Sequence, residues 1–263
     1  MSLPLTGRTA LVIGGSRGIG LASAAVLARL GATVVITATT QKGADRAAER
    51  MSATGPTDVD GLVVDVRSSR AVDLLFDRLL ARHHGCDILV NSAGITRIAP
   101  GRDTRPQDWD EIIAVNLTGS FLTTRAWLAR GGALERGWGR VVNIASTAGK
   151  QAAPMGMAYA ASKHGVLGMT RTLAVELAGT GVTVNAVCPG LVETDMSTGV
   201  REALTALTGG SPEEVLRRRN ALVPLGRHLS AEEVAETVGF LAAAPTDAVT
   251  GQAWNVCGGL GTY

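Results

Sequence analysis

The sequence has 263 residues, of which 46% are hydrophobic and 18% are charged, and its formal net charge is +2. This composition can bury a sizeable core, which argues against a disordered chain, and the small net charge indicates no particular class of partner. The basic run at 217–219 has no aromatic neighbours and no nucleic-acid motif around it, so we interpret it as a solvated helix face. No window approaches the ~18 consecutive apolar residues of a membrane span.

The cysteines and histidines also limit the chemistry that we expect. Cys86, Cys188 and Cys257 are an odd number with no Cys-x-x-Cys spacing, and the N-terminus lacks the pattern of a signal peptide. We therefore expect free thiols in a reducing cytoplasm. His83 and His84 are adjacent and would diverge on a helix, and we expect no metal site, no membrane contact and no nucleic-acid partner.

Short apolar runs alternate with helical patterns from one end of the chain to the other. The runs that we expect to be strands are 9–13, 33–37, 62–64, 87–90, 140–144, 182–187 and a last one near 253–256. Apolar residues at helical spacing predict helices over 19–30 and 72–79, a long one near 108–130, one around Tyr159 and one that starts at Ser230. Strands and helices therefore alternate along most of the chain.

Strands that are apolar on both faces and alternate with helices indicate a parallel sheet covered by helices on both sides. No linker divides the array, so we predict a single doubly wound α/β domain over 1–263, with a cofactor half at 1–150 and a catalytic and substrate half at 140–263. Segment 191–229 contains no predicted strand, and an insertion of this size is usually functional. We expect it to be a lid over the substrate or, alternatively, a helix pair that covers the sheet edge. The apolar residues that would form the inner face of the lid are Met196, Leu204, Leu207, Leu216 and 223–225.

A glycine-rich turn, Gly14-Gly-Ser-Arg-Gly18-Ile-Gly20, follows the first predicted strand and leads into a helix. Glycines let the backbone approach a phosphate closely, and the helix N-terminus offers free N–H groups and the positive end of its dipole. The spacing differs from the strict Gly-x-Gly-x-x-Gly pattern, and a P-loop is excluded because no Gly-Lys-Ser/Thr follows. The place of the turn in the first strand–helix unit favours cofactor phosphate binding over a merely tight turn.

The second predicted strand ends Thr37-Ala-Thr-Thr40, without the acidic residue that binds the ribose 2′-hydroxyl in NAD sites. A carboxylate would repel a 2′-phosphate, whereas hydroxyls and the guanidinium of Arg17 would bind one. The sequence therefore predicts NADPH/NADP+ as the cofactor, with Arg17 and Thr39 near its 2′-phosphate.

Several weak motifs occur in one order along the chain: Gly14-x-x-x-Gly18-x-Gly20, Asn91-Ser-Ala-Gly94, Asn116, Ser146 and Tyr159-x-x-x-Lys163, with 13 residues from Ser146 to Tyr159. In this order and spacing the chain resembles the short-chain dehydrogenase/reductase family over essentially its whole length. Segments 143–151, 162–165, 184–190 and 255–263 look most like ketoreductases of bacterial aromatic polyketide synthases. The glycine turn and 36–39 look more like 3-oxoacyl-carrier-protein reductases. The resemblance implies a Rossmann-like sheet of about seven strands in the order 3-2-1-4-5-6-7.

The resemblance also implies a catalytic set of four residues. Tyr159 would be the general acid, and Ser146 would hydrogen-bond the substrate carbonyl. Asn116 would hold a water of the proton relay, and Lys163 would bind the nicotinamide ribose and lower the cost of ionising Tyr159, because a nearby ammonium stabilises a phenolate. The cofactor set expected from the glycine turn and the resemblance together is Gly14, Ser16, Arg17, Gly18, Ile19, Gly20, Thr39, Asp65, Val66, Asn91, Ala93, Gly94, Tyr159, Lys163, Pro189, Gly190, Val192 and Thr194.

Three positions depart from the family pattern. Ile13 replaces a threonine that commonly opens the glycine motif, and Ser92 replaces the second asparagine of Asn-Asn-Ala-Gly. Segment 95–100 does not match the proline-diglycine segment that borders the substrate in the polyketide enzymes, so the substrate and the stereochemistry stay open.

The function we expect is an NADPH-dependent ketoreductase for a polyketide or β-ketoacyl thioester, which an acyl carrier protein could present near Arg67. Alternatives are a 3-oxoacyl-carrier-protein or acetoacetyl-CoA type reductase, and a dehydrogenase of another secondary alcohol. A non-catalytic NADP-binding regulator would be expected to lack one of the four catalytic residues. The resemblance also implies a homotetramer, formed through helices near 108–130 and 158–178 and the C-terminal strand.

Overall fold

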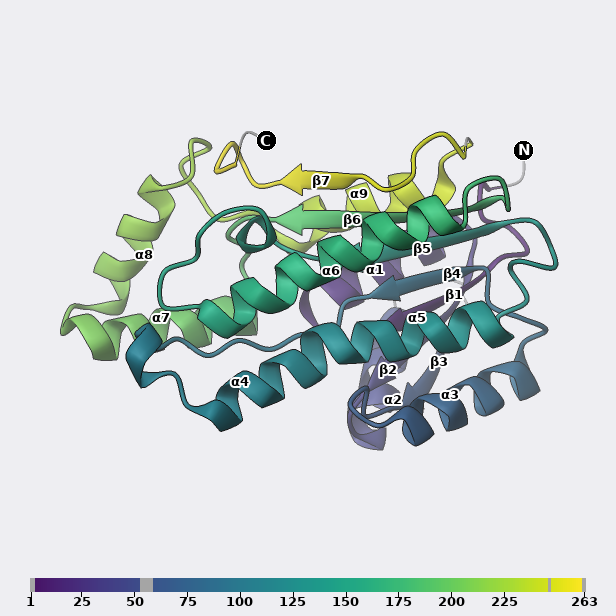
Figure 1. Ribbon diagram of the computed structural model, residues 1–263, viewed down its shortest axis with the longest axis horizontal. Coiled ribbons are helices and arrows are strands. Elements are labelled where there is room, and N and C mark those ends of the chain that lie inside the picture. The colour runs from purple at the N-terminus through teal and green to yellow at the C-terminus, as the bar shows by residue number, and fades with distance from the viewer. Residues whose placement is uncertain (1–2, 53–58, 246, 262–263) are drawn as a thin grey trace.

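The computed structural model of the protein describes residues 3–52, 59–245 and 247–261, so the end of the C-terminal segment 255–263 lies outside the described residues. Seven parallel strands form one sheet in the order β3-β2-β1-β4-β5-β6-β7, which confirms the predicted class and strand order (Figure 1). The strands are β1 (Thr9–Ile13), β2 (Thr33–Ala38), β3 (Val59–Val63), β4 (Ile88–Asn91), β5 (Gly139–Ile144), β6 (Val182–Pro189) and β7 (Ala253–Val256).

Helices cover both faces of the sheet. One face carries α1 (Gly18–Arg29), α2 (Gln41–Ser52) and α9 (Ala231–Ala243), and the other carries α3 (Ser69–Arg82), α4 (Pro106–Ile113), α5 (Gly119–Arg130) and α6 (Met157–Glu176). Helix α2 was not predicted, although its buried residues Ala44, Ala47 and Met51 lie at helical spacing. In the part of the chain that the structure describes, no helix is long and apolar enough to cross a bilayer.

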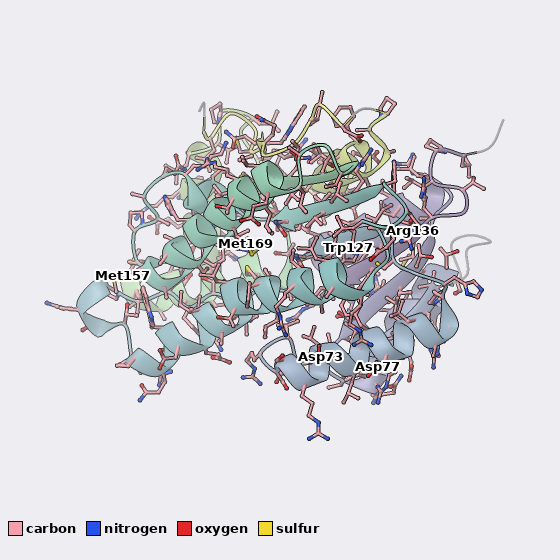
Figure 2. The ribbon with its side chains drawn as sticks, turned by 45° about the vertical axis from the view of Figure 1, so that its right-hand side comes forward. Asp73, Asp77, Trp127, Arg136, Met157 and Met169 are labelled. Carbon is pink, nitrogen blue, oxygen red and sulfur yellow. The ribbon has the colours of Figure 1, made fainter. Side chains whose placement is uncertain are left out.

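Each face of the sheet packs against its helices in a separate hydrophobic core, which explains why the strands are continuous apolar runs in the sequence. Ala10 and Val12 of β1 pack with α1 and α9, whereas Leu11 and Ile13 pack with α3 and α5, because successive side chains of a strand point to opposite faces. Trp127 fills the second core from α5 (Figure 2). Arg130 of the same helix donates to the carbonyl oxygen of Asp73 at 2.9 Å and pairs with Asp77, which ties α5 to α3.

The insertion 191–229 holds two helices, α7 (Asp195–Thr208) and α8 (Pro212–Ala221), beyond the carboxyl ends of the strands (Figure 1). Its base is closed by backbone hydrogen bonds from Glu193 N to Leu229 O at 2.9 Å and from Leu229 N to Leu191 O at 2.8 Å. Inside it, Val215 and Val223 are buried, whereas Leu204 and Leu216 are half-buried and Met196, Leu207 and Leu225 are exposed. Some of the apolar side chains thus pack inside the insertion, and others are exposed on its surface.

Candidate active site

The carboxyl ends of β1, β4, β5 and β6 lie at one edge of the sheet, where the strand order reverses between β1 and β4. Open α/β sheets bind their ligands in the crevice at this point. The structure brings all four candidate catalytic residues there. The ammonium nitrogen of Lys163 lies 5.6 Å from the ring centroid of Tyr159, and the phenol is hydrogen-bonded to Ser146. A side chain added at Gly94 would meet Asn116 Oδ1 at 3.5 Å and Lys163 Nζ at 3.7 Å.

Ser146 follows β5 and caps a short 3₁₀ turn, η3 (Thr147–Gly149). Its buried hydroxyl accepts a hydrogen bond from Ala148 N at 3.1 Å, which orients it. Because the same hydroxyl meets Tyr159, the two oxygens are placed to share one ligand oxygen, as an alkoxide-stabilising pair requires.

The charge states of Tyr159 and Lys163 are set mainly by burial. Desolvation raises the pKa of Tyr159 more than the hydrogen bond with Ser146 lowers it, and desolvation lowers the pKa of Lys163 to about 8. The ammonium donates to the carbonyl oxygen of Ile144 at 2.7 Å. The net shift of the pKa of Tyr159 is thus upward. At pH 7 the phenol is protonated, which is the form that can donate a proton.

Asn116 lies in a π-helical turn, η2 (Ala114–Thr118), which interrupts the single helix predicted near 108–130. Its fully buried amide accepts from Ile95 N at 2.8 Å and donates to Ile95 O at 2.9 Å and to Ser162 Oγ at 3.1 Å. These tertiary hydrogen bonds hold the extra residue in the helix, and such π turns occur frequently at functional sites. They also attach the loop after β4 to α6.

The glycine turn after β1 has the geometry that a pyrophosphate needs. Gly14 has φ +73°, and a Cβ there would lie 2.8 Å from the backbone of Ala93. A Cβ on Gly20 would lie 2.2 Å from the carbonyl oxygen of Gly14. Thr37, which belongs to the strand end expected to bind a 2′-phosphate, is buried and instead accepts from Gly14 N at 3.0 Å, so that it supports the turn. The turn leads into the N-terminus of α1, so these residues fit a dinucleotide phosphate.

Arg17 and Thr39 are both exposed at this crevice. One guanidinium nitrogen of Arg17 lies 3.3 Å from a carboxylate oxygen of Asp195 at the start of α7, and both side chains are 74% exposed. Asp195 was missed by the sequence reasoning. Exposed ion pairs of this kind contribute at most about 1 kcal/mol to stability, so a cofactor phosphate could replace Asp195 as the partner of Arg17.

The side chains of some predicted cofactor residues are hydrogen-bonded within the protein. Arg67 donates to Asp65 from Nη2 at 2.7 Å and from Nε at 2.9 Å, and this hydrogen bonding lowers the pKa of the Asp65 carboxyl. Asn91 is buried and bonds with Thr123, Thr124 and Asn143. The side chain of Asn91 is thus turned into the core, and its backbone is the part left for a cofactor.

The remaining predicted cofactor residues lie around the same crevice. Val66 is buried against Gly119, and Gly190 donates from its N–H to Val256 O at 2.9 Å after Pro189 ends β6. Val192 belongs to the base of the insertion, and the hydroxyl of Thr194 caps α7 through Ser197 N at 3.3 Å. A Cβ on Gly18 would approach Thr194 at 3.3 Å, so the glycine turn and the insertion are in contact. Ser16 and Ile19 are half-buried within the turn.

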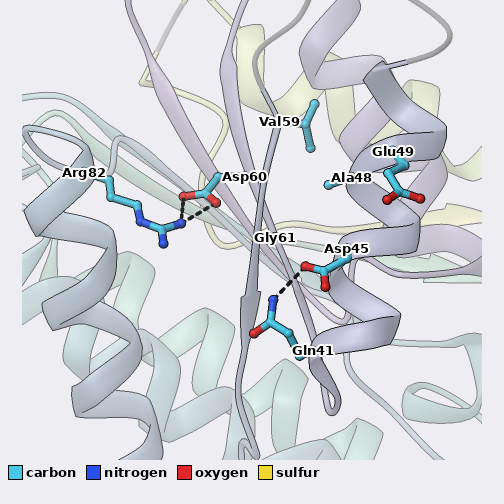
Figure 3. A pocket seen from close by; sticks show the side chains of 8 residues that line it. All are labelled: Gln41, Asp45, Ala48, Glu49, Val59, Asp60, Gly61 and Arg82. Carbon is cyan, nitrogen blue, oxygen red and sulfur yellow. Dashed lines mark hydrogen bonds and ion pairs between the residues drawn. The ribbon is translucent and has the colours of Figure 1, made fainter.

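A hollow of about 400 Å³ lies elsewhere, beside the edge strand β3 (Figure 3). Its lining residues are Gln41, Asp45, Ala48, Glu49, Val59, Asp60, Gly61 and Arg82. Arg82 Nη1 contacts Asp60 at 2.6 Å and Gln41 donates to Asp45 at 2.7 Å, so part of its polar surface is internally paired. None of the elements that line it carries a candidate catalytic residue.

The sequence pattern of a family described as enoyl-(acyl carrier protein) reductase matches residues 13–261. A Streptomyces virginiae protein assigned as the ketoacyl reductase of the monensin polyketide synthase is 43% identical over 258 residues, 98% of each chain. A 3-oxoacyl-carrier-protein reductase of Synechocystis is 41% identical over 97% of this chain and 98% of its own. The crystal structure of a variant of actinorhodin polyketide ketoreductase with NADPH superposes with a TM-score of 0.94, at 43% identity and over 100% of both chains.

These similarities cover nearly the whole chain and agree with the four residues gathered at the carboxyl ends of the strands. The chain belongs to the short-chain dehydrogenase/reductase family and is an oxidoreductase that acts on CH–OH and C=O groups.

Proposed function

We propose that the protein is an NADPH-dependent ketoreductase that reduces a ketone of a polyketide or β-ketoacyl thioester to a secondary alcohol. The observation that carries the proposal is the placement of Tyr159 beside Ser146 and Lys163, whose ammonium nitrogen lies 5.6 Å from the centroid of the phenol ring. The similarity to ketoreductases of polyketide synthases supports the substrate class. A non-catalytic regulator is disfavoured because all four catalytic residues are present and in one site.

In the proposed mechanism, NADPH supplies a hydride to the carbonyl carbon. Ser146 and Tyr159 hold the carbonyl oxygen, and Tyr159 donates its phenolic proton as negative charge develops there. Lys163 favours this transfer because its positive charge lies near the phenolate that forms. Asn116, whose amide joins the loop after β4 to α6, would hold the water that returns a proton to the site.

The cofactor preference is proposed to rest on Arg17 and on the carboxylate-free end of β2. Arg17→Ala should weaken the preference for NADPH over NADH, because a guanidinium contact with the 2′-phosphate is lost. Thr39→Asp should reverse or largely erase the preference by repulsion. The measurement is kcat/KM for both cofactors at low salt, where charge contacts are least screened.

Arg29→Ala is the matched control for this cofactor experiment. Arg29 is also an exposed arginine of α1, but it pairs with Glu236 at 2.6 Å and lies in the last turn of the helix, away from the glycine turn. It should leave the cofactor ratio unchanged. Equal kcat/KM values for NADPH and NADH in the unaltered protein would contradict the proposed role of Arg17.

The insertion 191–229 is proposed to be a lid that admits bulky ketones, with thioesters on a carrier protein preferred to the free acids. Removing 197–220 should raise KM for large bicyclic or aromatic ketones much more than for a minimal ketone, while NADPH affinity changes little. The reason is that this segment holds Leu204, Leu207 and Leu216, of which Leu207 is exposed and the other two are half-buried, beyond the carboxyl ends of the strands. A ketone panel with NADPH measures this and tests the proposed substrate class at the same time.

Gly199→Ala is the control for the lid, because a Cβ at this helical position meets no atom within 4 Å. It should leave every KM unchanged. If KM rises equally for large and small ketones in the shortened protein, the insertion is a structural element that covers the sheet edge and not a lid. A carrier protein that docks at Arg67 would have to compete with Asp65 for the guanidinium.

We also propose a single domain over the chain and a homotetramer. Phe121 on α5, Met157 on α6 and Trp254 on β7 are exposed apolar residues on the elements expected to meet a second copy. Sedimentation analysis of the protein tests this assembly.

A further inference from the structure

A chain of buried polar side chains runs across β4 and β5 on one face of the sheet, next to the candidate active site. Thr123 Oγ1 donates to Asn91 Oδ1 at 2.7 Å, Asn91 Nδ2 donates to Asn143 Oδ1 at 2.9 Å, and Asn143 Nδ2 donates to Thr170 Oγ1 at 2.9 Å. We call these four residues the polar chain. Asn91 and Asn143 face each other in the pairing of β4 with β5, and both helices that flank this part of the sheet, α5 and α6, supply its ends.

The polar chain has one hydrogen-bond orientation at its α6 end, whereas the single hydroxyl proton of Thr123 at the α5 end has Gly119 O at 2.9 Å as a second acceptor beside Asn91 Oδ1. The hydroxyl proton of Thr170 is donated to Val166 O at 2.8 Å, so its oxygen can only accept from Asn143. This places the amide nitrogen of Asn143 toward α6 and its amide oxygen toward Asn91. Asn143 is 0% exposed and Thr170 1% exposed, so water cannot replace a lost partner without a change in packing.

Each end of the polar chain lies close in sequence to a candidate catalytic residue. Thr170 follows Lys163 by seven residues on α6, which is two helical turns along the same face. Asn143 precedes Ser146 by three residues, and Thr123 follows Asn116 by seven. The polar chain therefore connects the three elements that carry the general acid, the carbonyl ligand and the proton relay.

We propose that Asn143 is a positioning residue that fixes α6 against β5 and β4, and so fixes Tyr159 and Lys163 relative to Ser146 and Asn116. This inference rests on the proposed function of those four residues. Because Asn143 accepts from Asn91 and donates to Thr170, these two hydrogen bonds favour one position of α6 beside β5. A misplacement of ~1 Å at a reacting group can cost ~100-fold in rate, so a small slip of this helix matters.

The test is Thr170→Val, which removes the hydroxyl with little change in shape. We expect kcat to fall by at least ~10-fold with KM for NADPH nearly unchanged, because alignment and not cofactor binding is lost. We also expect the apparent pKa of the general acid in the pH–rate profile to shift, since the surroundings of Tyr159 change. Thr170→Ser keeps the hydroxyl and should restore both values.

Two controls separate positioning from general destabilisation. Thr183→Val makes the same change at a similarly buried threonine near the amino end of β6. Asn185→Ala removes a buried amide that bonds Val249 O at 2.7 Å and Gln252 N at 3.0 Å, outside the polar chain. Both should leave kcat and the pH profile unchanged when measured well below their unfolding temperatures.

If Thr170→Val does not fold, Thr123→Val tests the opposite end of the polar chain and should show the same loss of kcat. A folded Thr170→Val or Thr123→Val protein with normal kcat and an unshifted pH profile overturns the proposal. Equal losses in Asn185→Ala also overturn it, since lost stability alone would then explain the effect. A different result would contradict the proposed function itself, namely a Tyr159→Phe protein that still reduces ketones at a near-normal rate.

Discussion

A Tyr159→Phe protein is expected to lose ketone reduction by at least ~100-fold, the lower range for a lost general acid. The substitution removes only the phenolic oxygen, so the ring still packs beside Lys163 and the fold should survive. The ligand-free protein holds the phenol protonated through neutral pH, because desolvation raises the pKa of Tyr159. The proton that the reaction needs is thus present before the substrate enters.

The measurement is single-turnover reduction of an accepted ketone, with NADPH binding followed separately by its fluorescence. Binding should change little, because the hydrogen bond that is lost joins Tyr159 to Ser146 and not to the glycine turn. Ser146→Ala should also impair turnover with an intact fold, which shows that both oxygens serve the same carbonyl. Near-normal turnover in Tyr159→Phe would remove this residue from the mechanism.

The sheet and the glycine turn could be predicted from sequence because local rules decide them. Strands buried on both faces are continuously apolar, which indicates a parallel sheet, and the family resemblance supplied the strand order. Gly20 is required locally, since a Cβ there would lie 2.2 Å from the Gly14 carbonyl oxygen. The family resemblance, carried by the joint spacing of Ser146, Tyr159 and Lys163, identified the candidate catalytic residues that the structure brings together at one edge of the sheet.

Features that depend on tertiary contacts could not be predicted in this way. The π turn exists because the amide of Asn116 bonds with Ile95 and Ser162, and no helical pattern reports such partners. Helix α2 is a different case, because its buried residues Ala44, Ala47 and Met51 are spaced by three and four, as on one face of a helix, and the sequence reasoning missed this pattern. The direction of the pKa shift of Tyr159 depends on how far its side chain is buried. The sequence distance from Tyr159 to Lys163 does not report this burial.

Lys163→Met should abolish most of the activity and at the same time stabilise the ligand-free protein. Lys163 is 5% exposed, and burial lowers the pKa of its ammonium from the ordinary 10.5 to about 8. Below pH 8 the folded protein holds this lysine charged and away from water, which lowers the free energy of unfolding by about 3 kcal/mol according to proton linkage. Methionine has a similar length and no charge, so the cost disappears, although the contact with Ile144 O is lost as well.

The sign of the pH dependence makes this prediction specific. Between pH 8 and 10.5 the unfolded chain holds the proton of Lys163 more tightly than the folded one, so the contribution of this lysine to the free energy of unfolding rises with pH. We expect Lys163→Met to be more stable than the unaltered protein by about 1–3 kcal/mol at pH 7, and this difference to shrink by pH 10. Denaturant unfolding of both ligand-free proteins at the two pH values measures it. A variant that is less stable at pH 7 would show that the hydrogen bond to Ile144 outweighs the desolvation of the charge. The catalytic role of Lys163 would then carry no cost in stability.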